Sequence, residues 1–591
     1  MPVSPAINRR YSIVAILILI VLGGLIYIFS LPNAMFWDDE DFILKNVFLR
    51  DWHDFPRFFS ENVIAGSHLL SNYWRPLLLT VFSAEWHLWH GRPAGWHLVN
   101  FGVHLADSIL LFFLIRRLFG LPRLAFLVSL LFLIHPIQTE AVVYINSLGD
   151  PLSVLFVFAG LIFYHRSRTS NNENDYALSM FMYILGLLSK ETAFMMPSLL
   201  FLVEFFLLDP GLSTRQKWKQ ILRWLWPFIL MAGIYLGLRA TVLNFNGTFN
   251  FYKEPDLFST NWAIRLFTFF RVLTVYLGLL IWPIHLHVER SVPIATSIFR
   301  TDVFLGCLVF FGALIAIFRL GRKRPLINFS LGWFFLTLLP ASNLFIPINA
   351  LLYEHWLYVP MIGFLLPLLG EGLKLAERYH LKVILCVCFL LSAFSFSFLS
   401  IQRILEWRDP IRFYELTLEY APKSYRVINN LGMAYADRGF LDKAQAAYER
   451  AISIDPSNPV AHHNIGNLFL AQNRLEAARK EYETAIRVDP KFLFTYPYLA
   501  NLYLRTNDYP SARRTLEKLF PYSQDPLGTL QTLFDIALQE KNYPAAFTYI
   551  TRALALSPHN WMIQKSFQEL QMRVNPSTSP ASLSPPSTIP R

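Results

Sequence analysis

The chain has 591 residues, of which 54% are hydrophobic and 16% are charged, and its formal net charge is +11. An average soluble domain is about 45–50% apolar and about 25% charged, so the composition excludes a mainly disordered chain and argues against one large soluble domain. The 53 phenylalanines instead indicate many helices that face lipid or a buried core. We assign the excess positive charge to loops that set membrane topology, and not to nucleic-acid binding.

The density of charge changes along the chain. Residues 1–405 contain 31 basic and 23 acidic residues, whereas the much shorter stretch 406–591 contains 21 and 18, so charged residues are denser there. This change predicts a membrane domain over 1–405 followed by a soluble part. The three cysteines lie within apolar runs without zinc-ligand spacing, which indicates small core or lipid-facing residues rather than a metal site.

Apolar runs of spanning length begin close to the N-terminus, and a spanning helix needs about 20 residues. The first run follows Arg9 and Arg10, and because no small-residue cleavage site comes after it, we expect an uncleaved first helix. The hydropathy pattern predicts about eleven to thirteen spans. The candidate runs lie near 11–31, 97–115, 122–138, 150–165, 176–190, 192–208, 221–240, 262–282, 301–320, 326–346, 349–370 and 382–402.

Clusters of Lys and Arg set the expected topology, because short basic loops stay in the cytoplasm. They place the N-terminus in the cytoplasm, loop 32–75 outside and the C-terminal half outside, in a bacterial inner membrane or an equivalent multi-pass location. Strict alternation through all candidate spans would put the C-terminal half inside, and the run 262–282, with two arginines, is the weakest span. The clusters lie at 9–10, 116–123, 166–168, 215–223, 319–324 and 374–382.

An acidic turn directly follows the first apolar run. Asp38, Asp39 and Asp41 lie within four residues there, on the expected outer side. A carboxylate in this position could act as a general base toward an acceptor hydroxyl, and the residues alone leave open which of the three it is. The alternative interpretation is a solvated helix start, since acids favour helix N-termini.

Three more polar segments fall on the same side under this topology. Acids suit the deprotonation of a hydroxyl, whereas Lys and Arg suit a phosphate or pyrophosphate leaving group. We therefore expect one shared cavity, with helix capping and local ion pairs as the alternative for each segment. The candidate cations are Lys190, Arg75 and Arg290, and the other candidates are His135, Glu140, Asp150, Glu191, Asn343, Glu354 and His355.

Two histidine groups have weaker patterns. His104 and Asp107 lie one helical turn apart in the second apolar run, and we expect them to pair inside the bundle. His285 and His287, with Glu289, have a spacing that is only weakly typical of metal ligands. The sequence contains no Walker loop, GxSxG elbow or HExxH motif, so it has no signature of ATP-driven or hydrolase chemistry.

A period of about 34 residues, which is the length of a tetratricopeptide unit, runs through the soluble part. Gly432 and Tyr448 of the first unit recur in the second as Gly466 and Tyr482. The period predicts an all-α solenoid at 425–575, with four units that start near 425, 459, 493 and 527. Such repeats usually bind a polypeptide, although packing on the membrane domain or dimerisation is the alternative. The Pro/Ser/Thr-rich segment 576–591 predicts a disordered tail.

The order of these motifs resembles the transmembrane-and-tetratricopeptide O-mannosyltransferases, within the polytopic GT-C glycosyltransferases. The fold expected from that resemblance is all-α, a polytopic membrane helix bundle followed by the repeat solenoid. The matching segments are Asp38-Asp39 with Ile43 and Asn46, Tyr73-Trp74-Arg75-Pro76, His97 to Asn100 with His104, His135-Pro136 with Glu140-Ala141-Val142 and Asp150, Lys190-Glu191, and Ser342 to Phe345 through Glu354 to Pro360.

The resemblance implies an inverting glycosyltransferase that moves a sugar from a polyprenyl-phosphate donor to an acceptor hydroxyl, a protein Ser or Thr, on the non-cytoplasmic face. It implies that Asp38 is the base with support from Asp39, and that Lys190 and nearby cations contact the donor phosphate. The repeats would recruit the acceptor protein or peptide. Family members mostly need no cofactor, although some GT-C enzymes bind a divalent metal near the acids.

Two positions depart from the family pattern. Gln138 replaces a second histidine, and Leu148 replaces an arginine that usually precedes the aspartate, so the sugar need not be mannose. The alternative functions are a non-enzymatic membrane scaffold for envelope assembly and a ligase or transporter of lipid-linked oligosaccharides.

Overall fold

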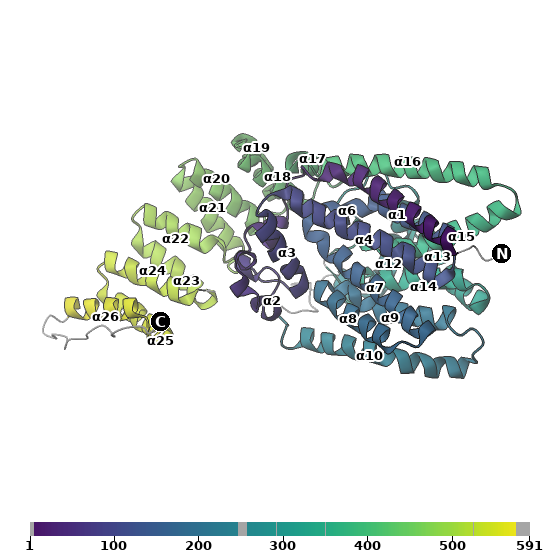
Figure 1. Cartoon of the computed structure of the whole chain (residues 1–591). Coiled ribbons are helices and arrows are strands. Elements are labelled where there is room, and N and C mark those ends of the chain that lie inside the picture. The colour runs from purple at the N-terminus through teal and green to yellow at the C-terminus, as the bar shows by residue number, and fades with distance from the viewer. Residues whose placement is uncertain (1–4, 246–256, 291, 349, 524, 575–591) are drawn as a thin grey trace. The chain divides into compact units, whose positions relative to one another are not determined.

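The structure is a computed structural model that describes residues 5–245, 257–290, 292–348, 350–523 and 525–574. It divides into two compact units, Met1–Pro422 and Lys423–Arg591. Within the described residues every regular element is a helix (Figure 1), so the expected all-α class is confirmed. The tail predicted at 576–591 lies outside the described residues.

The first unit is built from long apolar helices. Among the described residues, seven helices are long and apolar enough to cross a membrane, and a pair bent by 54°, Pro122–Ile134 with Pro136–Val143, would make an eighth. The bend lies at His135-Pro136, because the Pro136 nitrogen has no hydrogen to donate within a helix. The seven helices are α1 (Pro5–Tyr27), α4 (Pro93–Phe119), α7 (Gly149–Ser170), α10 (Thr214–Ala240), α12 (Trp262–Ile281), α13 (Thr301–Leu320) and α16 (Lys382–Glu406).

Four other apolar runs form helices that are shorter or carry more charge. The run expected at 349–370 becomes helical only from Pro360, which occupies the first helical position, where its missing N–H costs nothing. Residues 350–359 instead form a loop with a short turn, and this loop supplies polar side chains described below. These helices are α8 (Glu173–Ser189), α9 (Met196–Leu202), α14 (Pro325–Leu338) and α15 (Pro360–Arg378).

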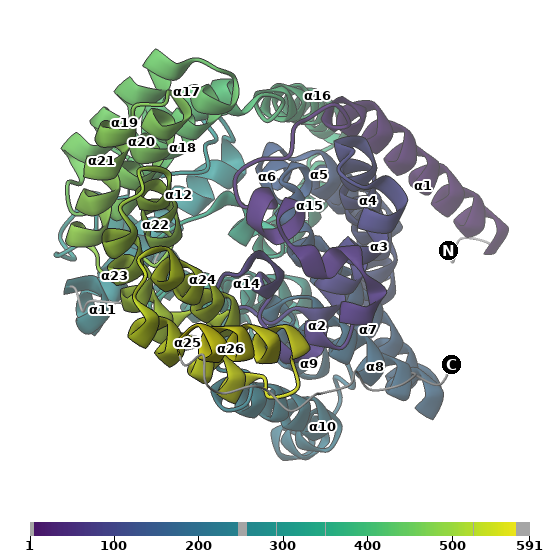
Figure 2. The ribbon, with the colours of Figure 1, turned by 90° about the vertical axis from the view of Figure 1, so that its left-hand side faces the viewer.

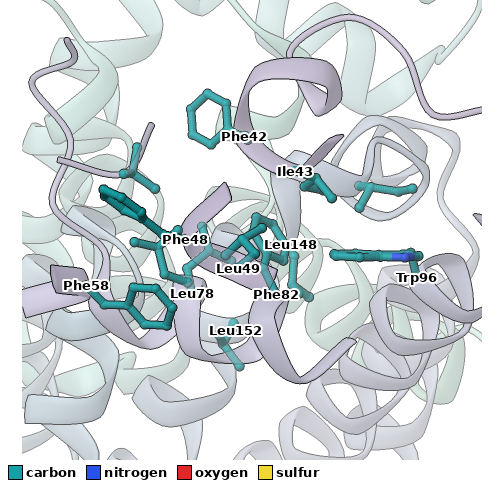
Figure 3. Close-up of a cluster of buried hydrophobic side chains, with 13 residues drawn as sticks. Phe42, Ile43, Phe48, Leu49, Phe58, Leu78, Phe82, Trp96, Leu148 and Leu152 are labelled. Carbon is teal, nitrogen blue, oxygen red and sulfur yellow. The ribbon is translucent and has the colours of Figure 1, made fainter. Parts of the chain in front are cut away.

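A buried apolar cluster holds the loop that carries the acidic turn. The loop between α1 and α3 (Pro76–Trp89) contributes Phe42, Ile43, Phe48 and Leu49, all buried. These side chains pack against residues of α3, α4 and α7, and Figure 3 shows them converging. The cluster therefore fixes a segment with little regular structure onto the helix bundle. Its labelled partners from outside the loop region are Leu78, Phe82, Trp96, Leu148 and Leu152.

The second unit is a row of antiparallel helix pairs, which Figure 2 shows following one another in a curve. The first helices of the first two pairs begin one repeat apart, at Tyr425 and Pro459. A Cβ on Gly432 would lie 2.5 Å from the Tyr448 ring, so only glycine lets the two helices of the pair approach this closely. The expected tetratricopeptide-type solenoid is confirmed. Its helices are α18 (Tyr425–Asp437), α19 (Leu441–Ile454), α20 (Pro459–Ala471), α21 (Leu475–Val488), α22 (Thr495–Arg505), α23 (Tyr509–Leu519), α24 (Pro526–Gln539), α25 (Tyr543–Leu556) and α26 (Trp561–Val574).

Candidate active site

The two adjacent acids after α1 have opposite environments. Asp39 is buried, and its two carboxylate oxygens accept hydrogen bonds from the backbone N–H groups of Asn146 at 3.0 Å and Phe36 at 3.3 Å. Burial raises the pKa of Asp39 well above its usual value, although the two N–H groups act in the other direction. Asp38 is exposed and hydrogen-bonded to the Tyr144 side chain. Of the pair, Asp38 is therefore the acid that an incoming hydroxyl can reach.

The third acid of the turn is occupied locally. The Lys45 ammonium group lies 3.3 Å from Asp41 and 2.9 Å from Glu40, and the Lys45 side chain is 57% exposed. An exposed ion pair of this kind contributes little to stability. Because Asp41 and Glu40 share the Lys45 ammonium, Asp38 is the remaining exposed acid of the turn and the candidate base.

A largely buried ion pair joins α7 to the segment after α8. The Lys190 ammonium nitrogen lies 2.5 Å from a carboxylate oxygen of Asp150, and the two side chains are 15% and 8% exposed. Lys190 directly follows the end of α8, and Asp150 is in the first turn of α7. The ion pair therefore fixes the position of a cation beside a helix N-terminus.

A second ion pair, between Arg75 and Glu191, involves the residue that follows Lys190. The Arg75 Nε and Nη2 atoms donate to Glu191 at 3.2 and 2.9 Å, and the guanidinium packs 4.5 Å from the centre of the Tyr73 ring. Although burial acts to raise it, Arg75 holds the pKa of Glu191 below its usual value. Arg75 is therefore a fixed, charged group in a desolvated setting, where charge-assisted hydrogen bonds are strong.

A second network surrounds the loop before α15. His355 Nδ1 lies 3.0 Å from one carboxylate oxygen of Glu140, and the His355 backbone N–H donates to the other oxygen at 3.2 Å. Glu354 accepts from the His287 backbone N–H at 2.7 Å and from Arg290 at 3.2 Å. Burial raises the pKa of Glu354 to about 7.

The ion pairs and acids adjoin one another. Burial raises the pKa of Tyr73, and the nearby charges of Arg75, Glu191 and Asp38 also act on it. The charge of Asp150 likewise acts on the Arg75 guanidinium, and the charge of Glu140 acts on the Arg403 guanidinium. The structure thus brings together side chains from the loop after α1, the turn before α7, the segment after α8 and the loop before α15. Acids and cations lie together there, a combination that can deprotonate a hydroxyl and stabilise an anionic leaving group.

Two of the predicted site residues hold the scaffold instead. His135 is fully buried, and its Nε2 atom lies 3.2 Å from the Leu280 carbonyl of α12. Asn343 bridges its own loop, since its side-chain amide donates to the Ala350 carbonyl at 3.0 Å and accepts from the Ile348 N–H at 2.5 Å. Both side chains hold backbone segments in place, and these contacts are to backbone groups rather than to the charged side chains of the site.

The expected pairing of His104 with Asp107 is replaced by a shared partner. The Tyr358 hydroxyl lies 2.7 Å from His104 Nδ1 and donates to Asp107 at 2.7 Å. This buried triad ties α4 to the loop before α15. The two residues that depart from the pattern of the resembled family have structural contacts. Gln138 donates to the Tyr358 carbonyl, and Leu148 packs in the apolar cluster of Figure 3.

The histidines with weak metal-ligand spacing have other partners. His285 Nδ1 lies 2.8 Å from the Tyr420 hydroxyl, and the His287 ring stacks on the Tyr420 ring with centroids 4.4 Å apart. In the part of the chain that the structure describes, no group of three His, Cys, Asp or Glu side chains is arranged to hold a metal ion.

Sequence reasoning missed Arg403. This residue lies in the last turn of α16, is 5% exposed, and has a guanidinium nitrogen 3.8 Å from Glu354 and another 2.6 Å from Glu406. The available signal was an arginine at the end of an apolar run, which by default indicates a functional or buried paired cation. The partner Glu354 lies in a separate segment of the chain and could not be read from that signal.

Comparison with known proteins gives three family matches. Residues 95–237 match the model described as "Dolichyl-phosphate-mannose-protein mannosyltransferase". Residues 432–472 match "TPR repeat", and residues 460–492 match "Tetratricopeptide repeat". The first match covers α4 through most of α10, and therefore includes Glu140, Asp150 and Lys190.

The chain is similar to protein O-mannosyl-transferases. A Caenorhabditis elegans relative of that name is 25% identical over 76% of this chain and 64% of its own length. TMTC3 of Mus musculus is 26% identical over 66% of this chain and 45% of its own length, and human TMTC4 is 26% identical over 63% and 57%. The chain thus spans about half to two thirds of the length of these relatives. The resemblance expected from the motifs is confirmed.

Proposed function

We propose that the protein is a membrane glycosyltransferase that transfers a sugar from a polyprenyl-phosphate donor to a hydroxyl of an acceptor protein, with inversion at the anomeric carbon. The observation that carries the proposal is the separation of roles between Asp38 and Asp39. One carboxyl is exposed beside Tyr144, and the other is buried and held by two backbone N–H groups. Such a split lets one acid act as a base while its neighbour fixes it in place.

In this proposal Asp38 accepts the proton of the acceptor hydroxyl as the oxygen attacks the anomeric carbon. The bond between that carbon and the lipid phosphate oxygen breaks, and the phosphate leaves with the electron pair. Lys190 and Arg75 supply the positive charge that stabilises the departing phosphate. Their present partners, Asp150 and Glu191, keep both cations oriented.

The proposed topology puts this chemistry on the non-cytoplasmic face. The acidic turn, Asp150 and Lys190 then share that face, and the basic loops at 116–123, 166–168 and 215–223 lie in the cytoplasm. The repeats are proposed to recruit the acceptor, since tetratricopeptide solenoids commonly offer a peptide-binding surface. The proposal does not specify the sugar, because Leu148 stands where the resembled family usually has an arginine.

The test compares two neighbouring carboxylates. Membranes containing the full chain are supplied with polyprenyl-phosphate sugars and an acceptor peptide, and sugar transfer is followed for Asp38→Asn and for the control Asp41→Asn. Loss of a general base typically costs about 10²–10⁴-fold in rate, so we expect that loss for Asp38→Asn and near-normal transfer for Asp41→Asn. Equal transfer by the two variants would overturn the role of Asp38. The mass added to the acceptor distinguishes one sugar from a preassembled chain, which an oligosaccharide ligase would transfer.

A further inference from the structure

A polar cavity lies at the other end of α7 from the candidate active site. Its volume is about 420 Å³. Asp150 lies in the first turn of α7 and Arg168 in the last, a separation of about 27 Å at about 1.5 Å per residue. A bilayer core is about 30 Å thick, so the cavity and the active site lie near opposite membrane surfaces. The cavity is lined by Arg168, Asn171, Asp209, Lys219, Gln220, Arg223 and Trp224.

The floor of the cavity is preformed. Arg168 is 11% exposed, and its guanidinium contacts Glu204 at 2.6 Å and Asp209 at 3.2 Å. The same guanidinium packs 4.5 Å from the centre of the Trp224 ring. Glu204 is fully buried and also accepts from the Tyr164 hydroxyl at 2.9 Å. Because Glu204 and Asp209 both contact Arg168, the floor is fixed in position and carries no surplus positive charge.

The mouth of the cavity carries the surplus positive charge. Lys219 and Arg223 are exposed and lie one turn apart on α10. Within the described residues neither of them forms an ion pair with an acid. The Arg223 guanidinium lies 5.7 Å from the centre of the Trp224 ring, which orients it along the rim. A cavity with this lining favours an anion such as a phosphate group.

An apolar stripe borders these two cations on the same helix. Trp218, Leu222 and Trp226 are spaced four residues apart and are 47%, 62% and 57% exposed. At about 100° per residue this stripe runs beside the row formed by Lys219 and Arg223. Tryptophans flanked by basic residues are typical of the membrane–water interface. A ligand that fits both features carries an anionic head and hydrocarbon chains.

We propose that this cavity binds the phosphate group of an anionic membrane phospholipid. Lys219 and Arg223 contact the phosphate, Arg168 and Trp224 form the floor beneath it, and the acyl chains lie along Trp218, Leu222 and Trp226. A free phosphate would satisfy the cations alone and would make no use of the stripe. The site is independent of the proposed transfer reaction, since it shares no residue with the acid–cation cluster at the other end of α7.

The test measures lipid binding to the full chain in detergent. Phosphatidylglycerol, phosphatidylcholine and inorganic phosphate are titrated separately, and binding is read from the thermal unfolding midpoint and from native mass spectrometry. We expect phosphatidylglycerol alone to bind and to raise the midpoint. The variant Lys219→Gln/Arg223→Gln should bind it about 30-fold more weakly. Each basic residue near an anionic lipid surface strengthens binding about fivefold, and the variant removes two of them.

The matched control is Arg215→Gln/Arg319→Gln, which removes two exposed cations that do not line the cavity. It should bind phosphatidylglycerol as the unmodified chain does. Unchanged binding by Lys219→Gln/Arg223→Gln would overturn the site, and so would an equal loss in the control, since that would indicate diffuse surface charge. A response to inorganic phosphate equal to that for phosphatidylglycerol would overturn the lipid as occupant.

Discussion

The Lys190 ammonium nitrogen lies 2.5 Å from a carboxylate oxygen of Asp150, and the two side chains are 15% and 8% exposed. The pair connects the first turn of α7 with the segment after α8. Removing two charges from water costs several kcal/mol per ion, and their attraction repays this only when the geometry is good. We therefore expect the pair to be retained for what Lys190 does in the site rather than for a net gain in stability.

Replacing Lys190 tests whether the residue is needed for sugar transfer or only for stability. Lys190→Met leaves a buried, uncompensated carboxylate, and we expect the free energy of unfolding to fall by about 3–5 kcal/mol. The double variant Lys190→Met/Asp150→Leu removes both charges and should regain most of that stability, yet sugar transfer should remain lost. Denaturant unfolding in detergent and the transfer assay check the two parts. Transfer restored together with stability would mean that Lys190 is only structural.

The Tyr358 hydroxyl contacts two buried side chains, His104 and Asp107. Tyr358→Phe removes the group that lies 2.7 Å from both His104 and Asp107 and leaves a buried carboxyl unsatisfied. We expect a loss of about 2–3 kcal/mol. Tyr27→Phe is the matched control, because that hydroxyl donates to the Leu133 carbonyl at 3.3 Å and, among the described residues, bonds no carboxylate. This variant should cost about 1 kcal/mol. The ranking of the two unfolding free energies checks the prediction, and equal losses would contradict it.

The buried Asp39 should make stability depend on pH. Burial raises its pKa in the folded state well above that of the unfolded chain, which is about 3.9. The folded state then binds the proton more tightly, so this group's contribution to stability is greatest below about pH 4 and falls as the pH rises above that value. Asp39→Asn should flatten this decline in the thermal midpoint. Asp41→Asn, which changes a partly exposed acid, should leave the decline unchanged. Identical pH profiles for the unmodified chain and both variants would rule out Asp39 as the source of the decline.

The close helix contact in the first repeat predicts a steric effect. A Cβ on Gly432 would lie 2.5 Å from the Tyr448 ring, so Gly432→Ala must displace that ring or separate α18 from α19. Overpacking of this kind costs about 1–3 kcal/mol. Gly237→Ala is the control, since a Cβ there meets no atom within 4 Å in α10, and it should be neutral or slightly stabilising. Limited proteolysis of the repeats in the full chain measures the difference. Equal cleavage rates would show that the contact relaxes freely.

The sequence by itself determined the elements that depend on near neighbours. The repeat period predicts the helix pairs because the small and aromatic residues that meet, such as Gly432 and Tyr448, lie within one pair. Apolar runs predict the long helices for the same reason, since length and hydropathy are local properties. The ordered motifs also predicted the resemblance to the O-mannosyltransferases and the segments that supply the charged groups.

Only the tertiary structure decided which of these groups meet and which are buried. Asp38 and Asp39 are adjacent in the sequence, and the difference between them arises because the Asn146 N–H, 107 residues away, bonds one of them. The contact between Glu140 and His355 spans 215 residues, and Arg403 reaches Glu354 only because α16 ends beside that loop. Such partners depend on how helices pack over the whole membrane unit, and no short window of sequence contains that information.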